Sequence, residues 1–293
     1  MLPTFIGIGV PRGGTTWLHD LLNSHPEVAM PQKRKEVHYF DTYYDKGQAW
    51  YESFFPNNTK PGLYHAVGEI TPHYLFRTPV RDRIASMSSV RHLLLMLRDP
   101  VARAHSHYTW RMRLDNYKGS FEQFIEDYPE AIEWGHYAQP MKHWLEVFRR
   151  EQFLILIHEQ IFVNPTATKQ RIAEFLGLDH GRFPADAGEQ RINTAVIPRF
   201  GGAYRLASRT GSRLRHAGLD WLPNLLGRKL GLKFLMFGRR RAPKPQLDPI
   251  IRRRVFERFS NDVEALELLL GLQIPQWRPD EIVNIDKARN SSM

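Results

Sequence analysis

The order of three segments near the N-terminus constrains the fold of this chain more than any other feature. An apolar run over Phe5–Val10 leads into a glycine-rich turn at 11–14, and the turn leads into an apolar-periodic segment over Thr15–Ser24. A short apolar run predicts a buried strand, and apolar residues at helical spacing predict a helix. The stretch therefore predicts a strand, a loop and a helix, an arrangement that binds phosphate groups.

The loop nearly matches the pattern G-x-x-x-x-G-K-[ST] of nucleoside-triphosphate sites. Gly9, Gly14 and Thr16 occupy the defining positions, but Thr15 stands where that pattern has lysine, and the cation of the loop is Arg12. We therefore expect the loop to bind a phosphate, but in a different way from an ATPase. The alternative is a glycine-rich turn that only begins a helix.

The residue types of the loop suit an anion. Gly13 and Gly14 let the backbone approach a phosphate closely, and the N–H groups at the start of the helix point toward it. The hydroxyls of Thr15 and Thr16 add donors, and Arg12 can reach a bridging oxygen.

Strand-like and helix-like segments alternate along the first 180 residues. His92–Leu97 and Phe153–His158 are continuous apolar runs, typical of parallel strands covered on both faces. The alternation predicts a three-layer α/β fold of the P-loop-like type, with a central parallel sheet flanked by helices. We expect one domain over 1–293, with a core at 3–180 and a basic helical region at 181–285 that includes one long helix over Pro249–Leu270.

The loops that follow Val10, Ile70 and Leu97 are expected at one edge of this sheet, because parallel sheets bind ligands at the carboxyl ends of their strands. Arg98 ends a buried strand, and Ser106 follows eight residues later, about two helical turns on. That spacing allows both side chains to contact one phosphate. The other interpretation is a helix capped by Asp99 with Pro100 at its first position, and both can hold together, since a helix N-terminus is itself an anion site.

A third candidate is the charged segment Lys33–Asp41. Glu36 lies between Lys35 and His38, and a carboxylate in such surroundings can act as a general base. A surface charge cluster is the alternative.

Composition limits other functions. The chain has no cysteine, which excludes disulfides and thiolate metal sites and favours a reducing compartment. The first predicted strand lies close to Met1, and no apolar run reaches the roughly 20 residues of a membrane span, so we expect a cytoplasmic protein. His105 and His107 are two residues apart on a predicted helix, which is a poor pair for one metal, and no metal is expected.

The net charge of +10 arises in the C-terminal third, where 199–258 contains 16 Lys or Arg and three Asp or Glu. A solvated basic face is one interpretation. The others are contact with an anionic acceptor, an anionic membrane surface or nucleic acid.

Taken together, these elements resemble the sulfotransferases that use 3′-phosphoadenosine 5′-phosphosulfate (PAPS), above all the branch of heparan sulfate and tyrosylprotein sulfotransferases and their bacterial relatives. Gly9–Leu18 is similar to the 5′-phosphosulfate loop of that family, and Leu94–Tyr108 to its 3′-phosphate motif. Lys35–Asp41 resembles the K-E-x-H-F-F-D segment of the heparan sulfate enzymes, and Gly68–Tyr74 their G-E-K-T-P-x-Y segment. The likeness covers about residues 5–180.

The resemblance implies a role for each matching residue. Glu36 would be the catalytic base, with His38 as the alternative base. Arg98 and Ser106 would bind the 3′-phosphate, and Arg199, in a closing loop over 193–199, is a further candidate contact. The 5′-phosphosulfate would be bound by Arg12, Gly13, Gly14, Thr15, Thr16 and Trp17.

Two positions depart from the family pattern. Arg12 stands where many members have a lysine that assists the leaving phosphate, although the tyrosylprotein branch has arginine there. Ile70 replaces a substrate-contacting lysine of the heparan sulfate enzymes, which argues against a heparan-like acceptor.

The function implied is transfer of a sulfuryl group from PAPS to a hydroxyl or amine of a carbohydrate, lipid-linked or small-molecule acceptor, with PAP as product and no metal. One alternative is a P-loop kinase with a degenerate loop, which would require ATP and Mg²⁺. The other is a membrane-surface or nucleic-acid-binding protein that uses the basic region. For the transferase we expect no nucleic-acid partner, and peripheral membrane contact through the basic region stays open.

Overall fold

The computed structural model describes residues 1–57, 62–188, 196–198, 237–241 and 245–279. The chain divides into two compact units. The first contains Met1–Ala104, Ile132–Ile192 and Pro249–Met293, and the second contains His105–Ala131 and Asn193–Asp248. No helix among the described residues combines the length and the apolar composition that crossing a bilayer requires.

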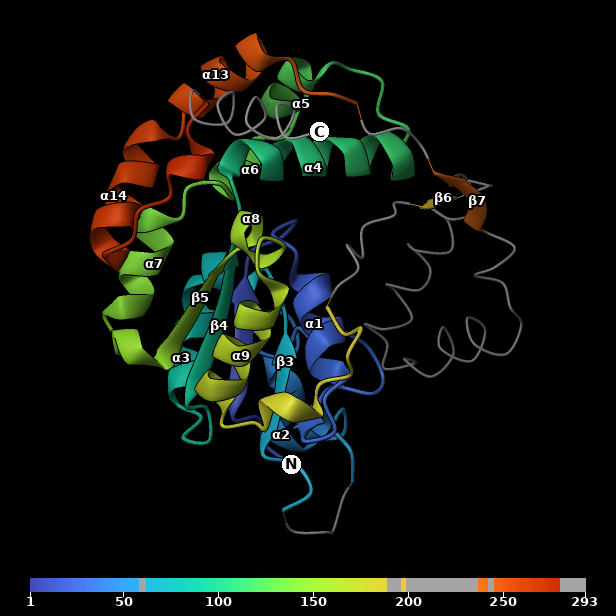
Figure 1. Cartoon of the computed structure of the whole chain (residues 1–293), viewed down its shortest axis with the longest axis vertical. Coiled ribbons are helices and arrows are strands. Elements are labelled where there is room, and N and C mark those ends of the chain that lie inside the picture. Colours follow the sequence, from blue (N-terminus) through green and yellow to red (C-terminus); the bar gives the residue numbers. More distant parts are fainter. Residues whose placement is uncertain (58–61, 189–195, 199–236, 242–244, 280–293) are drawn as a thin grey trace. The chain divides into compact units, whose positions relative to one another are not determined.

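The first unit is built on a five-stranded sheet with the strand order β2-β3-β1-β4-β5 (Figure 1). Every pairing in this sheet is parallel, as the alternation of segments predicted. The strands are β1 (Phe5–Gly9), β2 (Val28–Ala29), β3 (Ala66–Ile70), β4 (His92–Leu97) and β5 (Phe153–Ile157). Because β3, β1 and β4 are neighbours, their carboxyl ends, and the three loops predicted to bind ligand, lie at one edge.

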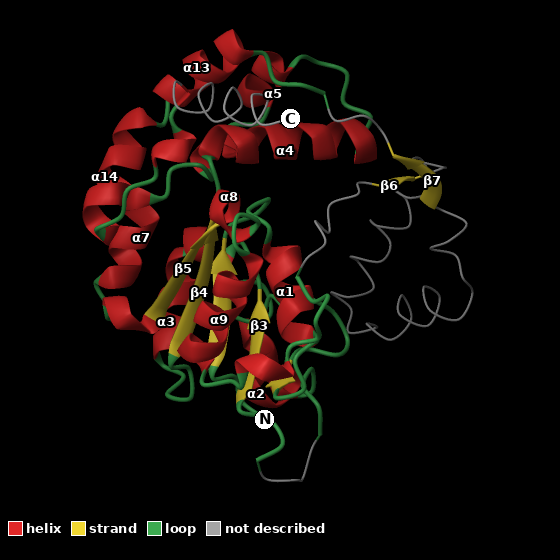
Figure 2. Ribbon diagram, in the orientation of Figure 1, coloured by secondary structure: helices red, strands yellow, loops and turns green. Residues whose placement is uncertain are grey.

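Helices lie on both sides of the sheet, which gives the expected three-layer arrangement (Figure 2). The helices of the first unit are α1 (Thr15–Asn23), α2 (Gly47–Glu52), α3 (Thr78–Ala85), α7 (Ala138–Leu145), α8 (His158–Ile161), α9 (Pro165–Leu176), α13 (Pro249–Glu257) and α14 (Ser260–Leu270). α4 (Pro100–Leu114) begins in the first unit and runs into the second, and α6 (Glu130–Glu133) leads back.

A hydrophobic core joins one face of the sheet to α1 and α9. Alternate residues of the strands, such as Leu94 and Met96 in β4, point into this core because side chains alternate along a strand. α1 contributes Trp17 and Leu21, and α9 contributes Ile172. This packing fixes the start of α1 at the carboxyl edge of the sheet.

The boundaries of α9 follow from local sequence signals. The side chain of Asn164 accepts a hydrogen bond from the N–H of Ala167, and Pro165 takes the first helical position. Gly177 ends the helix with φ 68°, the left-handed conformation that glycine adopts without steric cost.

The expected single helix over Pro249–Leu270 is wrong in one respect, because two helices occupy that stretch. α13 ends at Glu257 and α14 begins at Ser260. The N–H of Phe259 bonds to the carbonyl of Phe256, a tighter turn than an α-helix makes. The break buries Phe259 completely, with its ring 5.2 Å from that of His136. Tertiary packing here overrides an uninterrupted helical period.

The second unit contains α5 (Phe121–Asp127), capped by the Ser120 side chain, and an antiparallel pair of β6 (Val196–Pro198) and β7 (Phe237–Arg241). The rings of His105 and His107 in α4 lie edge-on to phenylalanines of α5, at 5.2 and 5.3 Å between centroids. Both histidines are buried, so they pack among aromatic rings.

Candidate active site

The loop between β1 and α1 adopts the conformation of an anion-binding turn. Arg12 and Gly14 have φ of 67° and 103°, and the N–H of Gly13 bonds to the carbonyl of Val10. A Cβ at Gly13 would lie 2.8 Å from the carbonyl oxygen of Met96, so only glycine fits this approach to β4. Such alternating conformations turn successive N–H groups to one side, where an anion can bind.

The start of α1 adds further donors to this loop. Gly14 is the N-cap residue, and no side chain among the described residues caps the start of α1. The first N–H groups of the helix are those that have no partner within the helix. Thr15 is buried, and the hydroxyl of Thr16 accepts a hydrogen bond of 2.9 Å from Lys35 Nζ. The side chain of Trp17 is buried in the core, where its indole N–H donates to the carbonyl of Gly188 at 2.8 Å. Trp17 thus anchors the loop by packing its side chain into the hydrophobic core.

Lys35 connects this loop to the predicted base. Its ammonium group lies 2.9 Å from Thr16 Oγ1 and 3.6 Å from Glu36 Oε1. The other carboxylate oxygen of Glu36 lies 3.6 Å from His38 Nε2, and His38 Nδ1 lies 3.0 Å from Asp41 Oδ2. Lys35, Glu36, His38 and Asp41 therefore form a continuous chain of opposite charges that begins at the loop.

The surroundings keep Glu36 ionised. Burial raises the pKa of Glu36, but the hydrogen bond from His38 and the charge of Lys35 outweigh it, and the net pKa is lower than usual. Burial lowers the pKa of His38, but the hydrogen bonds to Asp41 and Glu36 raise it to about 9. At neutral pH the segment thus presents a carboxylate beside an imidazolium.

A buried carboxylate beneath this segment was assigned no role by sequence reasoning. Glu69, at the end of β3, is inaccessible to solvent. It accepts hydrogen bonds from the hydroxyls of Thr71 (2.6 Å), Tyr74 (2.8 Å) and Tyr51 (3.3 Å), and from the N–H of Val37 at 3.2 Å. Since Val37 lies between Glu36 and His38, Glu69 anchors the charged segment Lys33–Asp41, hereafter the base segment, to the sheet. The likeness of Gly68–Tyr74 to a family segment was the signal that pointed here.

His73 is a second residue that sequence reasoning missed. It follows β3 in the turn Thr71–Tyr74, and its ring centroid lies 6.1 Å from that of His38 and 5.1 Å from that of Trp134. Burial lowers the pKa of His73, so its imidazole is neutral at pH 7. No motif marked this residue, because its proximity to Glu36 arises from the pairing of strands.

Arg98 lies beside the phosphate loop as expected. Its guanidinium donates a 3.0 Å hydrogen bond to the carbonyl of Arg12, and its own carbonyl accepts from the Tyr137 hydroxyl. Asp99 caps α4 by accepting from the N–H of Val101, and it pairs with Arg252 at 2.6 Å. The aspartate-capped helix is therefore present, and it places Arg98 at the carboxyl edge of the sheet.

Two further predicted contacts of the 3′-phosphate, Ser106 and Arg199, are not brought together with Arg98 by the described residues of one unit. Ser106 lies in the second turn of α4, in the other compact unit, and Arg199 lies outside the described residues. The closing loop over 193–199 also falls largely outside them.

The aromatic residues near the base segment are mostly core residues. Of the six aromatics at 39–51, Tyr39, Phe40, Tyr43 and Tyr51 are buried, with at most 7% of each exposed. Tyr39 and Tyr51 stack on each other at 4.3 Å. These four rings support the base segment and are unavailable to stack on a ligand.

A comparison with protein families finds one family model that matches about two thirds of this chain. The family model described as "Sulfotransferase domain" matches residues 2–194, which include the phosphate loop, the base segment and Arg98.

Curated relatives show the same kind of protein. Human heparan sulfate glucosamine 3-O-sulfotransferase 3B1 is 36% identical over 186 residues, which are 60% of this chain and 46% of that protein. The membrane-associated sulfotransferase kil1 of Dictyostelium discoideum is 36% identical over 138 residues, 45% of this chain and 29% of that protein. The chain spans about half the length of the first of these relatives.

Among solved structures, a sulfotransferase from Alicyclobacillus acidocaldarius superposes with a TM-score of 0.66 and 22% identity. The match covers 94% of this chain and 99% of that one. At this identity the likeness concerns the fold, and it agrees with the parallel sheet flanked by helices described above.

Proposed function

This chain belongs to the sulfotransferase domain family, and from that membership and the geometry of the site we propose that it transfers a sulfuryl group from PAPS to an acceptor hydroxyl. One observation carries the proposal. Lys35 Nζ lies within reach of both Thr16 in the phosphate loop and the Glu36 carboxylate, so the base and the donor loop share one side chain. A carboxylate held at that point lies where an acceptor must approach the donor.

The residues of the loop and Arg98 suit the two phosphate-containing ends of the donor. The N–H groups and hydroxyls of 13–16, with the Arg12 guanidinium, suit the 5′-phosphosulfate. Trp17 holds that loop on the core, and Arg98, beside the loop, suits the 3′-phosphate. When bound, the donor supplies the sulfuryl group and a phosphate leaving group.

Glu36 acts as the general base. Its carboxylate removes the proton of the acceptor hydroxyl as the oxygen forms a bond to sulfur, and the bond between sulfur and the 5′-phosphate oxygen breaks in line. The electron pair of that bond goes to the phosphate, where Arg12 and Lys35 stabilise the added negative charge. His38 keeps Glu36 ionised and oriented, which is a positioning role, since His38 with a pKa of about 9 is already protonated at neutral pH.

The acceptor is a carbohydrate hydroxyl in this proposal. Curated relatives named as heparan sulfate glucosamine 3-O-sulfotransferases support the class of acceptor. The specific polymer is left open because Ile70 is buried in the core, where the resemblance places a substrate-contacting lysine in the heparan enzymes. The relatives' names specify 3-O-sulfation, and this supports a hydroxyl acceptor here.

The test uses Glu36→Gln with labelled PAPS and a panel of glycans. We expect turnover to fall by about 10²- to 10⁴-fold, the usual contribution of a general base, with binding of PAP retained. Glu264→Gln, an exposed change on α14, is the matched control and should keep full activity. Near-normal transfer by Glu36→Gln would contradict the assignment of the base, and transfer from labelled ATP in place of PAPS would contradict the reaction.

A further inference from the structure

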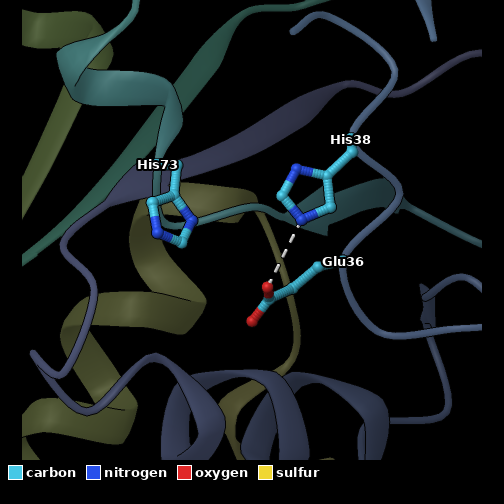
Figure 3. A group of neighbouring side chains, drawn as sticks. All are labelled: Glu36, His38 and His73. Carbon is cyan, nitrogen blue, oxygen red and sulfur yellow. Dashed lines mark ion pairs between the residues drawn. The ribbon is translucent and has the colours of Figure 1, made fainter. Parts of the chain in front are cut away.

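A cluster of metal-ligating side chains lies beside the base. The ligand atoms of Glu36, His38 and His73 all lie within 4.8 Å of one another (Figure 3). We propose that these three side chains form a binding site for a divalent transition metal of the Zn²⁺ type, and that the bound ion blocks the base. The blocking rests on the proposed function, whereas the site itself does not.

The donor set matches the preferences of zinc. Two imidazoles and one carboxylate, with an open fourth position, form a recurrent three-residue Zn²⁺ site. Ligands at about 2.0–2.2 Å from a tetrahedral ion lie roughly 3.3–3.6 Å apart. His38 Nε2 and Glu36 Oε2 are already 3.6 Å apart, so the pair needs almost no movement. The metal displaces the proton of His38 Nε2 to solvent, since a ligating imidazole must be neutral. Figure 3 shows the carboxylate reaching between the two imidazoles.

His38 has the outer partner that a ligating histidine requires. Its Nδ1 lies 3.0 Å from Asp41 Oδ2, which directs Nε2 toward Glu36. A carboxylate behind a ligating histidine fixes the ring and makes its other nitrogen a better ligand. The backbone holds the same geometry, because the carbonyl of His38 accepts from the N–H groups of Thr42 and Tyr43.

His73 provides an independent indication of a ligand. Its Nδ1 is buried and has no hydrogen-bond partner among the described residues. A buried polar atom without a partner costs about 1–3 kcal/mol, which a ligand would recover. The ring is held in place by its edge-on contact with Trp134, and the turn that carries it is tied to Glu69 through Thr71 and Tyr74. His73 is therefore a prepositioned ligand.

The site changes what the base can do. A metal bound to Glu36 Oε2 draws electron density from the carboxylate and makes it a weaker base, while Lys35 remains on Oε1. The inference departs from the expectation of no metal, which rested on the absence of cysteine, on the poor spacing of His105 and His107, and on the family resemblance. Metal occupancy thus opposes proton removal by Glu36.

Binding is tested by titration with Zn²⁺ in the absence of donor and acceptor, and by the visible absorption of Co²⁺ as a stand-in. We expect one ion per chain for the unchanged protein. His73→Ala and Glu36→Gln should each weaken the affinity at least about tenfold, the scale on which ligand-shell changes act. His143→Ala removes an exposed imidazole and is the matched control, with unchanged binding expected.

Three outcomes would overturn the site. These are no binding at micromolar Zn²⁺, equal binding by His73→Ala and the unchanged protein, and equal affinity for Mg²⁺, which prefers oxygen ligands. Because these measurements need no turnover, they stand or fall separately from the proposed reaction.

Inhibition is tested with the sulfuryl-transfer assay. Zn²⁺ should inhibit the unchanged protein at the concentrations that fill the site, and the inhibition constant of His73→Ala should rise by the same factor as its dissociation constant. Inhibition that is identical in both proteins would overturn the blocking of the base.

Discussion

At the scale of single residues, the geometry of the candidate site depends on how His38 and Glu69 are held. His38 has φ of 57°, a left-handed conformation that costs a non-glycine residue about 1–2 kcal/mol. The hydrogen bonds to its carbonyl and the contacts of its ring with Glu36 and Asp41 hold it there. Strained residues are retained where the surrounding structure determines them, as at catalytic sites.

Glu69 is the residue whose removal should most affect the site from a distance. Glu69→Ala leaves three hydroxyls and the N–H of Val37 without their acceptor, at about 1–3 kcal/mol for each group left unsatisfied. We expect the free energy of unfolding to fall by at least about 4 kcal/mol in denaturant titration. Glu264→Ala on α14 is the surface control, and an equal loss in both variants would contradict this role.

The conservative variant Glu69→Gln separates positioning from stability. The amide keeps the size of the side chain but replaces one acceptor oxygen with a donor. We expect kcat to fall more than the affinity for PAP, because the base segment moves while the phosphate loop stays. A change confined to KM for the donor would contradict the positioning role.

At the scale of elements, the loop between β1 and α1 lies tightly against β4. The N–H of Val10 bonds to the carbonyl of Met96, the same oxygen that a Cβ at Gly13 would meet at 2.8 Å. That oxygen belongs to the backbone of a central strand and cannot move aside alone. The loop conformation is thus set by the sheet.

Gly13→Ala should therefore widen the loop. We expect a loss of about 1–3 kcal/mol of stability, as for other overpacking changes, together with weaker binding of PAP measured by calorimetry. Gly181→Ala is the matched control, since its added Cβ would meet only the flexible side chain of Asp179 at 3.3 Å. Unchanged affinity for PAP in Gly13→Ala would show that the loop does not bind the donor.

At the scale of the whole molecule, an ion pair between Glu27 and Arg182 links the residue before β2 to the segment after α9. Glu27, one residue before β2, bonds to the N–H of Asp179 at 3.0 Å and to Arg182 at 2.6 Å, more than 150 residues along the chain. The hydrogen bond from the Asp179 backbone, with Arg182 and His65, lowers the pKa of Glu27 to about 2, against the opposing effect of burial. The contact joins the start of the domain to the segment after α9.

This lowered pKa predicts an acid-dependent stability. A carboxyl whose folded pKa lies below its unfolded value stabilises the protein above the unfolded pKa of 4.5, and the contribution is lost as the pH falls toward 2. We expect Tm of the unchanged protein to fall more steeply between pH 4.5 and 2.5 than Tm of Glu27→Gln. The two Tm curves should converge at low pH, and parallel curves would contradict the linkage.

The position of the protein in the cell and its contact with membranes remain predictions from sequence, as does the reading of 1–293 as one domain. Most of the basic region over 199–258 lies outside the described residues. Binding to anionic vesicles, compared at low and high salt, is the measurement that addresses it.

The sequence by itself determined the strand, loop and helix at the N-terminus and the parallel sheet, because periodicity and turn residues act over short distances. It also predicted Glu36 as the base, an assignment that stays a prediction. Strand boundaries such as His92–Leu97 follow from the same local signals. Only the tertiary structure decided that Glu69 and His73 lie under and beside Glu36, that Trp17 is a core residue, and that the helix breaks before Ser260. The physical reason is that β3 pairs with β1 across more than 60 residues, and no local pattern encodes which side chains such a pairing brings together.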